Sequence, residues 1–167
     1  CKNVIPTIVL SIAKDLVKDA NYTEAFAKID EAKKVAAEYA SEEVATEAAE
    51  LLPQVKKLYA KSLFDGKDYA AAIDAYKEVL ALDPEDGASA LRLGMALSNT
   101  GAQEEAIEAY KNAAALGQEA NATKQISSIY LKDAAAQLKA KAYAAAAEAA
   151  KNCNQYAENA QAYLVLG

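Results

Sequence analysis

The side chains that most often carry out enzyme chemistry are rare in this sequence or are explained by its predicted helices. The chain has no histidine, the residue most used for acid–base catalysis near neutral pH. The paired carboxylates Glu42-Glu43 and Glu104-Glu105 stand at the starts of predicted helices, where the helix dipole favours negative charge. No glycine-rich loop leads into a Lys-Ser or Lys-Thr pair that could hold a phosphate. We therefore expect no catalytic site, no cofactor, no bound metal and no enzyme activity.

The two cysteines, Cys1 and Cys153, stand near opposite ends of the sequence and fit no metal-binding spacing. We expect no disulfide between them, because the Cα atoms of a bridge lie within about 7 Å, and we expect an inert core thiol at Cys153. A chain that begins with cysteine resembles a mature bacterial lipoprotein, whose first cysteine carries lipid. That interpretation places the protein in the bacterial periplasm or on a membrane rather than in the cytoplasm. The alternative is that Cys1 is only the point where a longer chain was cut.

The net charge argues against nucleic acid as a partner. The chain carries a formal charge of −6 and has a sequence pI of about 4.8, whereas phosphate binding requires a concentrated positive field. The stretch from Val4 to Ala13 is too short to span a bilayer and contains Pro6, so we predict no transmembrane segment.

Alanine decides the predicted fold class. The chain contains 42 alanines, which favour helices strongly and contribute little apolar area each. Only three prolines interrupt it. This composition predicts an all-α fold with closely packed helices.

A unit of 34 residues occurs twice in succession, at 53–86 and 87–120, and within it residues 69–80 align with residues 103–114. The matched residues include an Ala-Ile pair and a tyrosine in each copy, namely Ala72, Ile73 and Tyr76 and then Ala106, Ile107 and Tyr110. A helix–turn–helix period of 34 residues is the tetratricopeptide spacing. The pair Leu93-Gly94, with Leu97 three residues later and Gly101 ending the helix, closely resembles the tetratricopeptide signature.

This resemblance implies a right-handed superhelix of antiparallel helix pairs, an α-solenoid with about four repeats and the start of a fifth. The repeats are expected at 6–39, 53–86, 87–120 and 127–159, with a helical insertion at 40–52 and an incomplete repeat at 160–167, all in one domain spanning 1–167. We interpret 42–64 as one long helix bent at Pro53 and capped by Ser41. The alternative is two helices, with Pro53 as the first residue of the second.

The two helices of such a repeat cross closely only where the facing residues are small. The eight positions that the resemblance assigns to these crossings are all Gly or Ala: Ala13 with Ala25, Ala60 with Ala72, Gly94 with Ala106, and Ala134 with Ala146. The tyrosines that follow the turns or lie on second helices are expected to pack in the core with a hydrogen-bonded hydroxyl, rather than to form a ligand cage. They are Tyr22, Tyr69, Tyr76, Tyr110 and Tyr143.

Proteins that this chain resembles bind a peptide or a partner helix in a groove lined by the first helix of each repeat. The residues expected to line that groove are mostly basic or apolar: Lys14, Lys18, Lys57, Lys61, Leu91, Arg92, Met95, Asn99, Leu131 and Lys132. The second helices carry most of the acid: Glu24, Asp30, Glu31, Asp74, Glu78, Glu104, Glu105, Glu108 and Glu148. The groove is therefore predicted to be electropositive and to select an acidic partner, although ordinary solvated lysines would give the same pattern.

Two functions follow from these features. The first is a non-enzymatic scaffold that binds a protein partner, with Leu10, Leu91, Met95 and Leu131 exposed in the groove. The second is self-assembly into a homo-oligomer through the ends of the array. The apolar run Tyr163-Leu164-Val165-Leu166 copies the opening of a further helix, so we expect it to be covered by more chain, by a second copy or by the preceding helix pair.

The assigned register can be tested at Ala106. Replacing Ala106 with leucine would overpack the crossing with the first helix of the same repeat and should lower the free energy of unfolding by about 1–3 kcal/mol. Thermal or denaturant unfolding measures this change. A melting temperature equal to that of the wild type would contradict the register.

Overall fold

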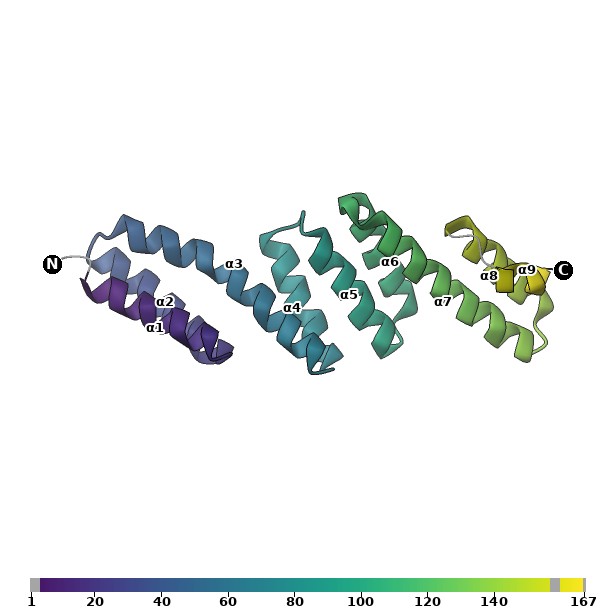
Figure 1. The fold of residues 1–167 in the computed structure, drawn as a ribbon, viewed down its shortest axis with the longest axis horizontal. Coiled ribbons are helices and arrows are strands. Elements are labelled where there is room, and N and C mark those ends of the chain that lie inside the picture. Colours follow the sequence, from purple (N-terminus) through teal and green to yellow (C-terminus); the bar gives the residue numbers. More distant parts are fainter. Residues whose placement is uncertain (1–3, 157–159, 167) are drawn as a thin grey trace. The chain divides into compact units, whose positions relative to one another are not determined.

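In a computed structural model, residues 4–156 and 160–166 are described, and they form a succession of helices (Figure 1). In chain order these are α1 (Val4–Lys18), α2 (Tyr22–Glu38), α3 (Glu42–Asp65), α4 (Tyr69–Leu82), α5 (Gly87–Thr100), α6 (Gln103–Ala113), a short π-helical segment η1 (Ala114–Gln118), α7 (Glu119–Lys139), α8 (Tyr143–Tyr156) and α9 (Ala160–Leu166). Consecutive helices pack as antiparallel pairs, α1 with α2, α3 with α4, α5 with α6, and α7 with α8. The predicted all-α class with paired helices is confirmed.

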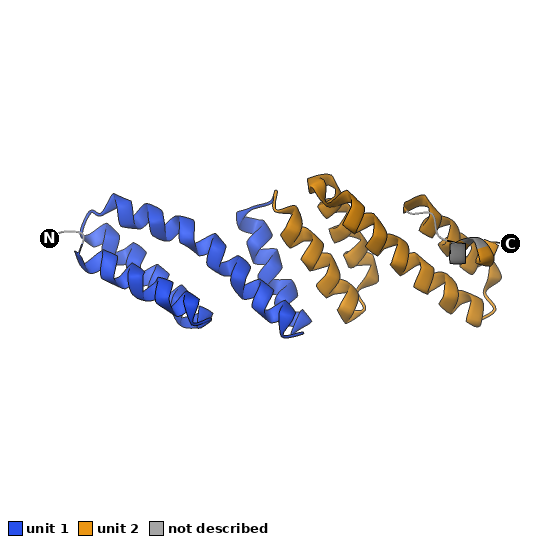
Figure 2. Cartoon of the chain, viewed as in Figure 1, with its two compact units in different colours: residues 1–84 blue, residues 85–167 orange. Residues whose placement is uncertain are grey.

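The chain divides into two compact units, residues 1–84 and 85–167 (Figure 2). Unit 1 holds α1 to α4 and unit 2 holds α5 to α9. The division falls close to the repeat boundary expected after residue 86. The superhelical course and the single domain stay predictions. Cys1 and Gly167 lie outside the described residues, so the lipid on Cys1 stays a prediction as well. Among the helices described, none is long and apolar enough to cross a membrane.

The predicted helix crossings are confirmed as buried positions. The seven alanines assigned to the crossings have no exposed surface, and Gly94 is buried as well. Because alanine presents only a methyl group, the backbones of a pair can approach closely along these contacts. Burial at all eight positions agrees with the assigned register, which stays a prediction.

A tyrosine fills the space beside the crossing in α5 and α6. A Cβ atom added to Gly94 would lie 2.7 Å from Cδ1 and Cε1 of Tyr110, so the ring rests directly on the glycine backbone. Tyr110 is 1% exposed, and its burial raises the pKa of the phenol to about 12 despite a hydrogen bond with Ser98. The equivalent Tyr76 in unit 1 is fully buried. Core packing is thus confirmed for these two tyrosines.

The insertion at 40–52 lengthens a helix of the following repeat. Residues 42–65 form one continuous helix, α3, which contains Pro53, so the single-helix interpretation is confirmed. Ser41 occupies the N-cap position of α3, as predicted, but its hydroxyl makes no capping hydrogen bond and has no partner among the described residues. Capping carboxylates instead precede the next two helices, where Asp68 accepts from Ala71 N and Asp86 from Ser89 N, both at 3.2 Å.

Two glycines of unit 2 adopt the left-handed backbone conformation. Gly101 ends α5 in the left-handed conformation with φ of 87°, as predicted. Gly117 has φ of 86° and interrupts the helical path between α6 and α7. The segment it belongs to packs on the start of α5, where a Cβ atom on Gly87 would lie 2.5 Å from the carbonyl oxygen of Leu116. The backbone approach at Gly87 therefore requires glycine.

Three expectations about exposure are wrong. Leu10 is 2% exposed and belongs to the core of unit 1, because it faces α2 and α3 rather than an open surface. Tyr143 is 66% exposed. Leu164 is 82% exposed, because α9 folds back on α7 and α8 through Ala162 and Val165 and leaves Leu164 on its outer side. Cys153 is buried and free, and its Sγ shares a 3.1 Å hydrogen bond with Ser127 Oγ, as expected of a core thiol.

The contact between Gly94 and Tyr110 makes a test of this packing. Gly→Ala in an unobstructed helix stabilises by up to about 1 kcal/mol, but here the added methyl would collide with the ring. Gly94→Ala should therefore lower the free energy of unfolding by about 1–3 kcal/mol. In the Tyr110→Leu background the same change should cost less, because the obstructing ring is gone. Denaturant unfolding of the four variants of this cycle measures the coupling, and stabilisation by Gly94→Ala alone would contradict the contact.

Candidate functional site

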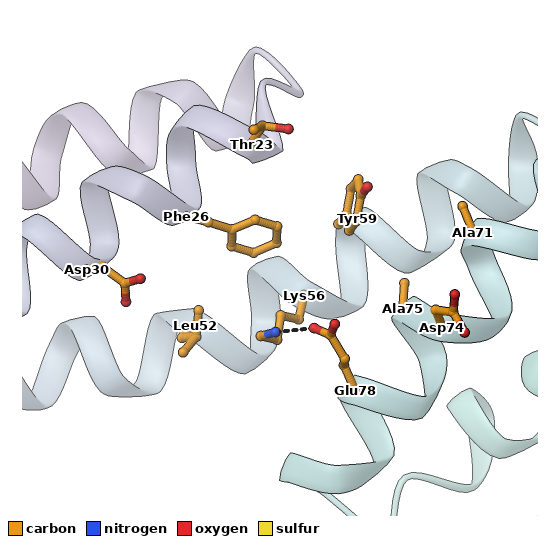
Figure 3. A pocket seen from close by; sticks show the side chains of 10 residues that line it. All are labelled: Thr23, Phe26, Asp30, Leu52, Lys56, Tyr59, Ala71, Asp74, Ala75 and Glu78. Carbon is orange, nitrogen blue, oxygen red and sulfur yellow. Dashed lines mark hydrogen bonds and ion pairs between the residues drawn. The ribbon is translucent and has the colours of Figure 1, made fainter.

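A cleft of about 660 Å³ opens in unit 1 between α2, α3 and α4 (Figure 3). Its lining comes from one face of each helix, at spacings of three, four and seven residues: Thr23, Phe26 and Asp30 from α2, Leu52, Lys56 and Tyr59 from α3, and Ala71, Asp74, Ala75 and Glu78 from α4. Residues at these spacings share a helix face. The site is therefore formed entirely by regular helices.

The insertion explains why the cleft lies here. The added turns of α3 place Val44 and Ala48 in the same core cluster as α1 and α2, so α2 packs along the first part of α3. The other end of α3 packs on α4, where Phe64 meets the rings of Tyr69 and Tyr76. Near residues 52–59 of α3, side chains of both α2 and α4 line the same cleft. The cleft is the space between them.

One aromatic ring from α2 and one from α3 face the cleft. The Tyr59 ring lies edge-on to Phe26, with centroids 5.6 Å apart and planes at 86°, and it also contacts Tyr22 at 5.8 Å. The Phe26–Tyr59 pair is edge-to-face and the Tyr22–Tyr59 pair is tilted at 54°, both favourable arrangements for aromatic rings. Phe26 and Tyr59 are half-buried, so part of each ring faces the cleft. We call these two rings the aromatic floor.

Lys56 stands at the centre of the cleft. Its Nζ lies 5.7 Å from the centroid of the Phe26 ring, within the range of a cation–π contact. The same ammonium donates a hydrogen bond to the Glu78 carboxylate of α4 and forms an ion pair with it. The Lys56 side chain is 25% exposed and that of Glu78 is 62% exposed. The lysine charge is therefore held between a ring and a carboxylate.

Two further carboxylates, Asp30 and Asp74, stand on the α2 and α4 walls (Figure 3). Both are exposed, and neither makes a hydrogen bond or ion pair within residues 4–156 and 160–166. The lining thus contains three carboxylates and one ammonium. Its chemistry is that of recognition, with ionic, aromatic and apolar contacts available to one ligand.

The residues predicted for the first-helix groove are divided between the units. Lys14, Lys18, Lys57 and Lys61 lie on α1 and α3 of unit 1, and Leu91, Arg92, Met95, Asn99, Leu131 and Lys132 lie on α5 and α7 of unit 2. None of the ten lines the cleft.

Ion pairs reduce the free positive charge on α1 and α3. Lys14 pairs with Glu47, Lys18 with Asp15 and Lys61 with Asp65. On α5 the Asn99 side chain donates to the carbonyl of Met95, one turn earlier in its own helix. Leu91, Met95 and Leu131 are half-buried.

The sequence places the acids of the cleft on second helices but does not show that they lie together. Asp30, Asp74 and Glu78 are predicted only as second-helix charges, and the predicted site does not include Phe26. A usable signal was present, because an insertion within a repeat array displaces neighbouring helices from their regular spacing. Aromatic and charged residues at helical spacing beside such an insertion are candidates for a site.

Comparison with known proteins gives no family. No family model and no curated protein sequence matches the chain. Among solved structures, MamA from Desulfovibrio magneticus RS-1 is 18% identical, with 90% of this chain and 75% of that chain covered and a TM-score of 0.46. MamA MSR-1 is also 18% identical, with coverages of 92% and 97% and a TM-score of 0.47. PilF from Pseudomonas aeruginosa is 17% identical, with coverages of 98% and 82% and a TM-score of 0.39. Values this low support no transfer of function.

Proposed function

We propose that this chain is a non-enzymatic protein-binding module of tetratricopeptide-like helical repeats, and that the cleft of unit 1 holds a segment of its partner. The observation that carries the proposal is the cleft itself, in which three helices present an aromatic floor between charged walls. An open volume of about 660 Å³ accommodates a few side chains of a peptide.

The helices that form the cleft support binding with little rearrangement. Ala25, Ala60 and Ala72 are fully buried where α2, α3 and α4 pack, so each wall is fixed by the core behind it. A site that is already formed loses little conformational entropy when a ligand arrives. The exposed lining residues contribute contacts, whereas the buried ones maintain the shape.

In this proposal, the first helices of each unit offer a further binding surface, separate from the cleft. On α5 and α7, Arg92 and Lys132 make no ion pair with the residues described, which leaves their charge available to an acidic ligand. The lysines of α1 and α3 that form ion pairs offer less free positive charge to such a ligand. A variant with Lys57→Glu, Lys61→Glu and Arg92→Glu removes positive charge from the first helices α3 and α5 and changes no residue that lines the cleft.

The cleft can be tested by filling it. Peptides of about twelve residues would be selected from a displayed random library, and their affinities for the purified chain measured by fluorescence anisotropy. Ala71→Tyr places a ring in the cleft from α4 and should weaken binding roughly tenfold or more. Ala70→Tyr is the matched control, because Ala70 is exposed and does not line the cleft.

Unchanged binding by Ala71→Tyr would contradict the proposed site, provided that circular dichroism shows both variants folded. If the triple first-helix variant loses the same peptides, the partner occupies that surface in place of the cleft.

Self-assembly is a second candidate function, favoured by exposed apolar residues on α1. Val4, Ile5, Ile8 and Ile12 are 56%, 46%, 53% and 42% exposed. Ile8 and Ile12 are one turn apart and Val4 is one turn before them, so they form a stripe along the helix. A contiguous apolar stripe often marks an interface. The same stripe on a second copy of the chain is also apolar, so two copies could pack stripe against stripe.

Sedimentation velocity over a range of concentrations tests this second function. The wild type should gain mass as concentration rises, and Ile8→Glu should remain a monomer because a carboxylate would be buried in the contact. Ala27→Glu adds the same charge at an exposed position of α2, outside the stripe, and serves as the control. A wild type that sediments as a monomer at every concentration rules out self-assembly through the stripe.

A further inference from the structure

We propose that the cleft of unit 1 selects a basic segment of its partner, with cationic side chains on Asp30 and Asp74 and an apolar side chain on the aromatic floor. This inference rests on the proposed function, since it names the chemistry of the segment that the cleft would hold. The cleft would therefore prefer a basic ligand, whereas the first-helix groove is predicted to prefer an acidic one.

The accessible charge in the cleft is negative. The one cation of the lining, Lys56, is mostly buried and its ammonium already pairs with Glu78. Asp30 and Asp74 are exposed and make no ion pair within the described part of the chain. A ligand that enters therefore meets two carboxylates free to accept, and an acidic ligand would be repelled by both.

The arrangement of the carboxylates suggests the pattern of the ligand. Asp30 belongs to α2 and Asp74 to α4, and Figure 3 shows them on either side of the Lys56–Glu78 pair, with the floor between the walls. A segment lying across α3 would place one cation at each wall. Between the two cations, an apolar residue would cover the exposed parts of the rings. The fitting sequence is thus basic, apolar, basic.

The floor also suits a cation. Lys56 Nζ already lies against the Phe26 ring, which shows that this ring offers its face to an ammonium. A lysine or arginine of the partner that reaches Tyr59 gains the same kind of attraction in addition to the carboxylates. The net charge of −6 adds a long-range attraction for basic ligands that is not specific to the cleft, so the experiment must separate the two.

The test uses two synthetic peptides of about twelve residues, one built of Lys and Leu and the other with each Lys replaced by Glu. Fluorescence anisotropy with the full chain should show the Lys/Leu peptide binding roughly tenfold or more tightly, with affinity falling as salt rises. The Asp30→Asn, Asp74→Asn double variant should weaken binding of the Lys/Leu peptide roughly tenfold. The control is the Glu43→Gln, Glu50→Gln double variant, which removes the same net charge from α3 outside the cleft and should change affinity by less than about twofold.

The outcomes separate this inference from the function on which it rests. Tighter binding of the Glu/Leu peptide overturns the inference, and so does equal weakening in the two double variants, which would show attraction by net charge alone. If Ala71→Tyr abolishes binding while the aspartate variant does not, the cleft is a binding site but its charge preference is wrong. If neither variant affects a bound Lys/Leu peptide, both the site and the inference are wrong.

Discussion

The whole structure depends on close approach between paired helices, and that approach depends on small residues at the crossings. Ala13, Ala60 and Ala134 have no exposed surface, so a larger side chain at any of them would press on the helices packed around it. Because alanine buries little apolar area, the crossings set the distance between the paired helices and contribute little hydrophobic stabilisation. The large buried side chains beside them, such as Tyr76 and Tyr110, contribute more of the buried apolar area and therefore more of the hydrophobic stabilisation.

A change in this regular packing creates the cleft. The extra turns of α3, from residue 42 to residue 52, join the core of α1 and α2 and leave the later turns of the helix to α4. Phe26, Lys56 and Tyr59 then face a space that side chains do not fill. The insertion thus links a feature of the sequence, a break in the repeat period, to a surface that can bind.

The sequence predicted those features that depend on local or repeated patterns. Residue size at matched positions identified the crossings, and Gly101 was recognised because a left-handed helix end favours glycine. Features that depend on how three helices meet were not predictable in this way. Ser41 has the right residue type for a cap, yet its hydroxyl makes no cap bond, and Leu164 faces outward because α9 packs through Ala162 and Val165. The cleft escaped prediction for the same reason, since its residues come from three helices.

Backbone amide chemical shifts, followed by NMR while the Lys/Leu peptide is added to the isotopically labelled chain, map the bound surface residue by residue. If the cleft holds a basic segment, the largest changes will lie in residues 23–30, 52–59 and 71–78, the stretches that carry its lining. Changes concentrated instead on α1 and α5, with those three stretches unaffected, would contradict the account.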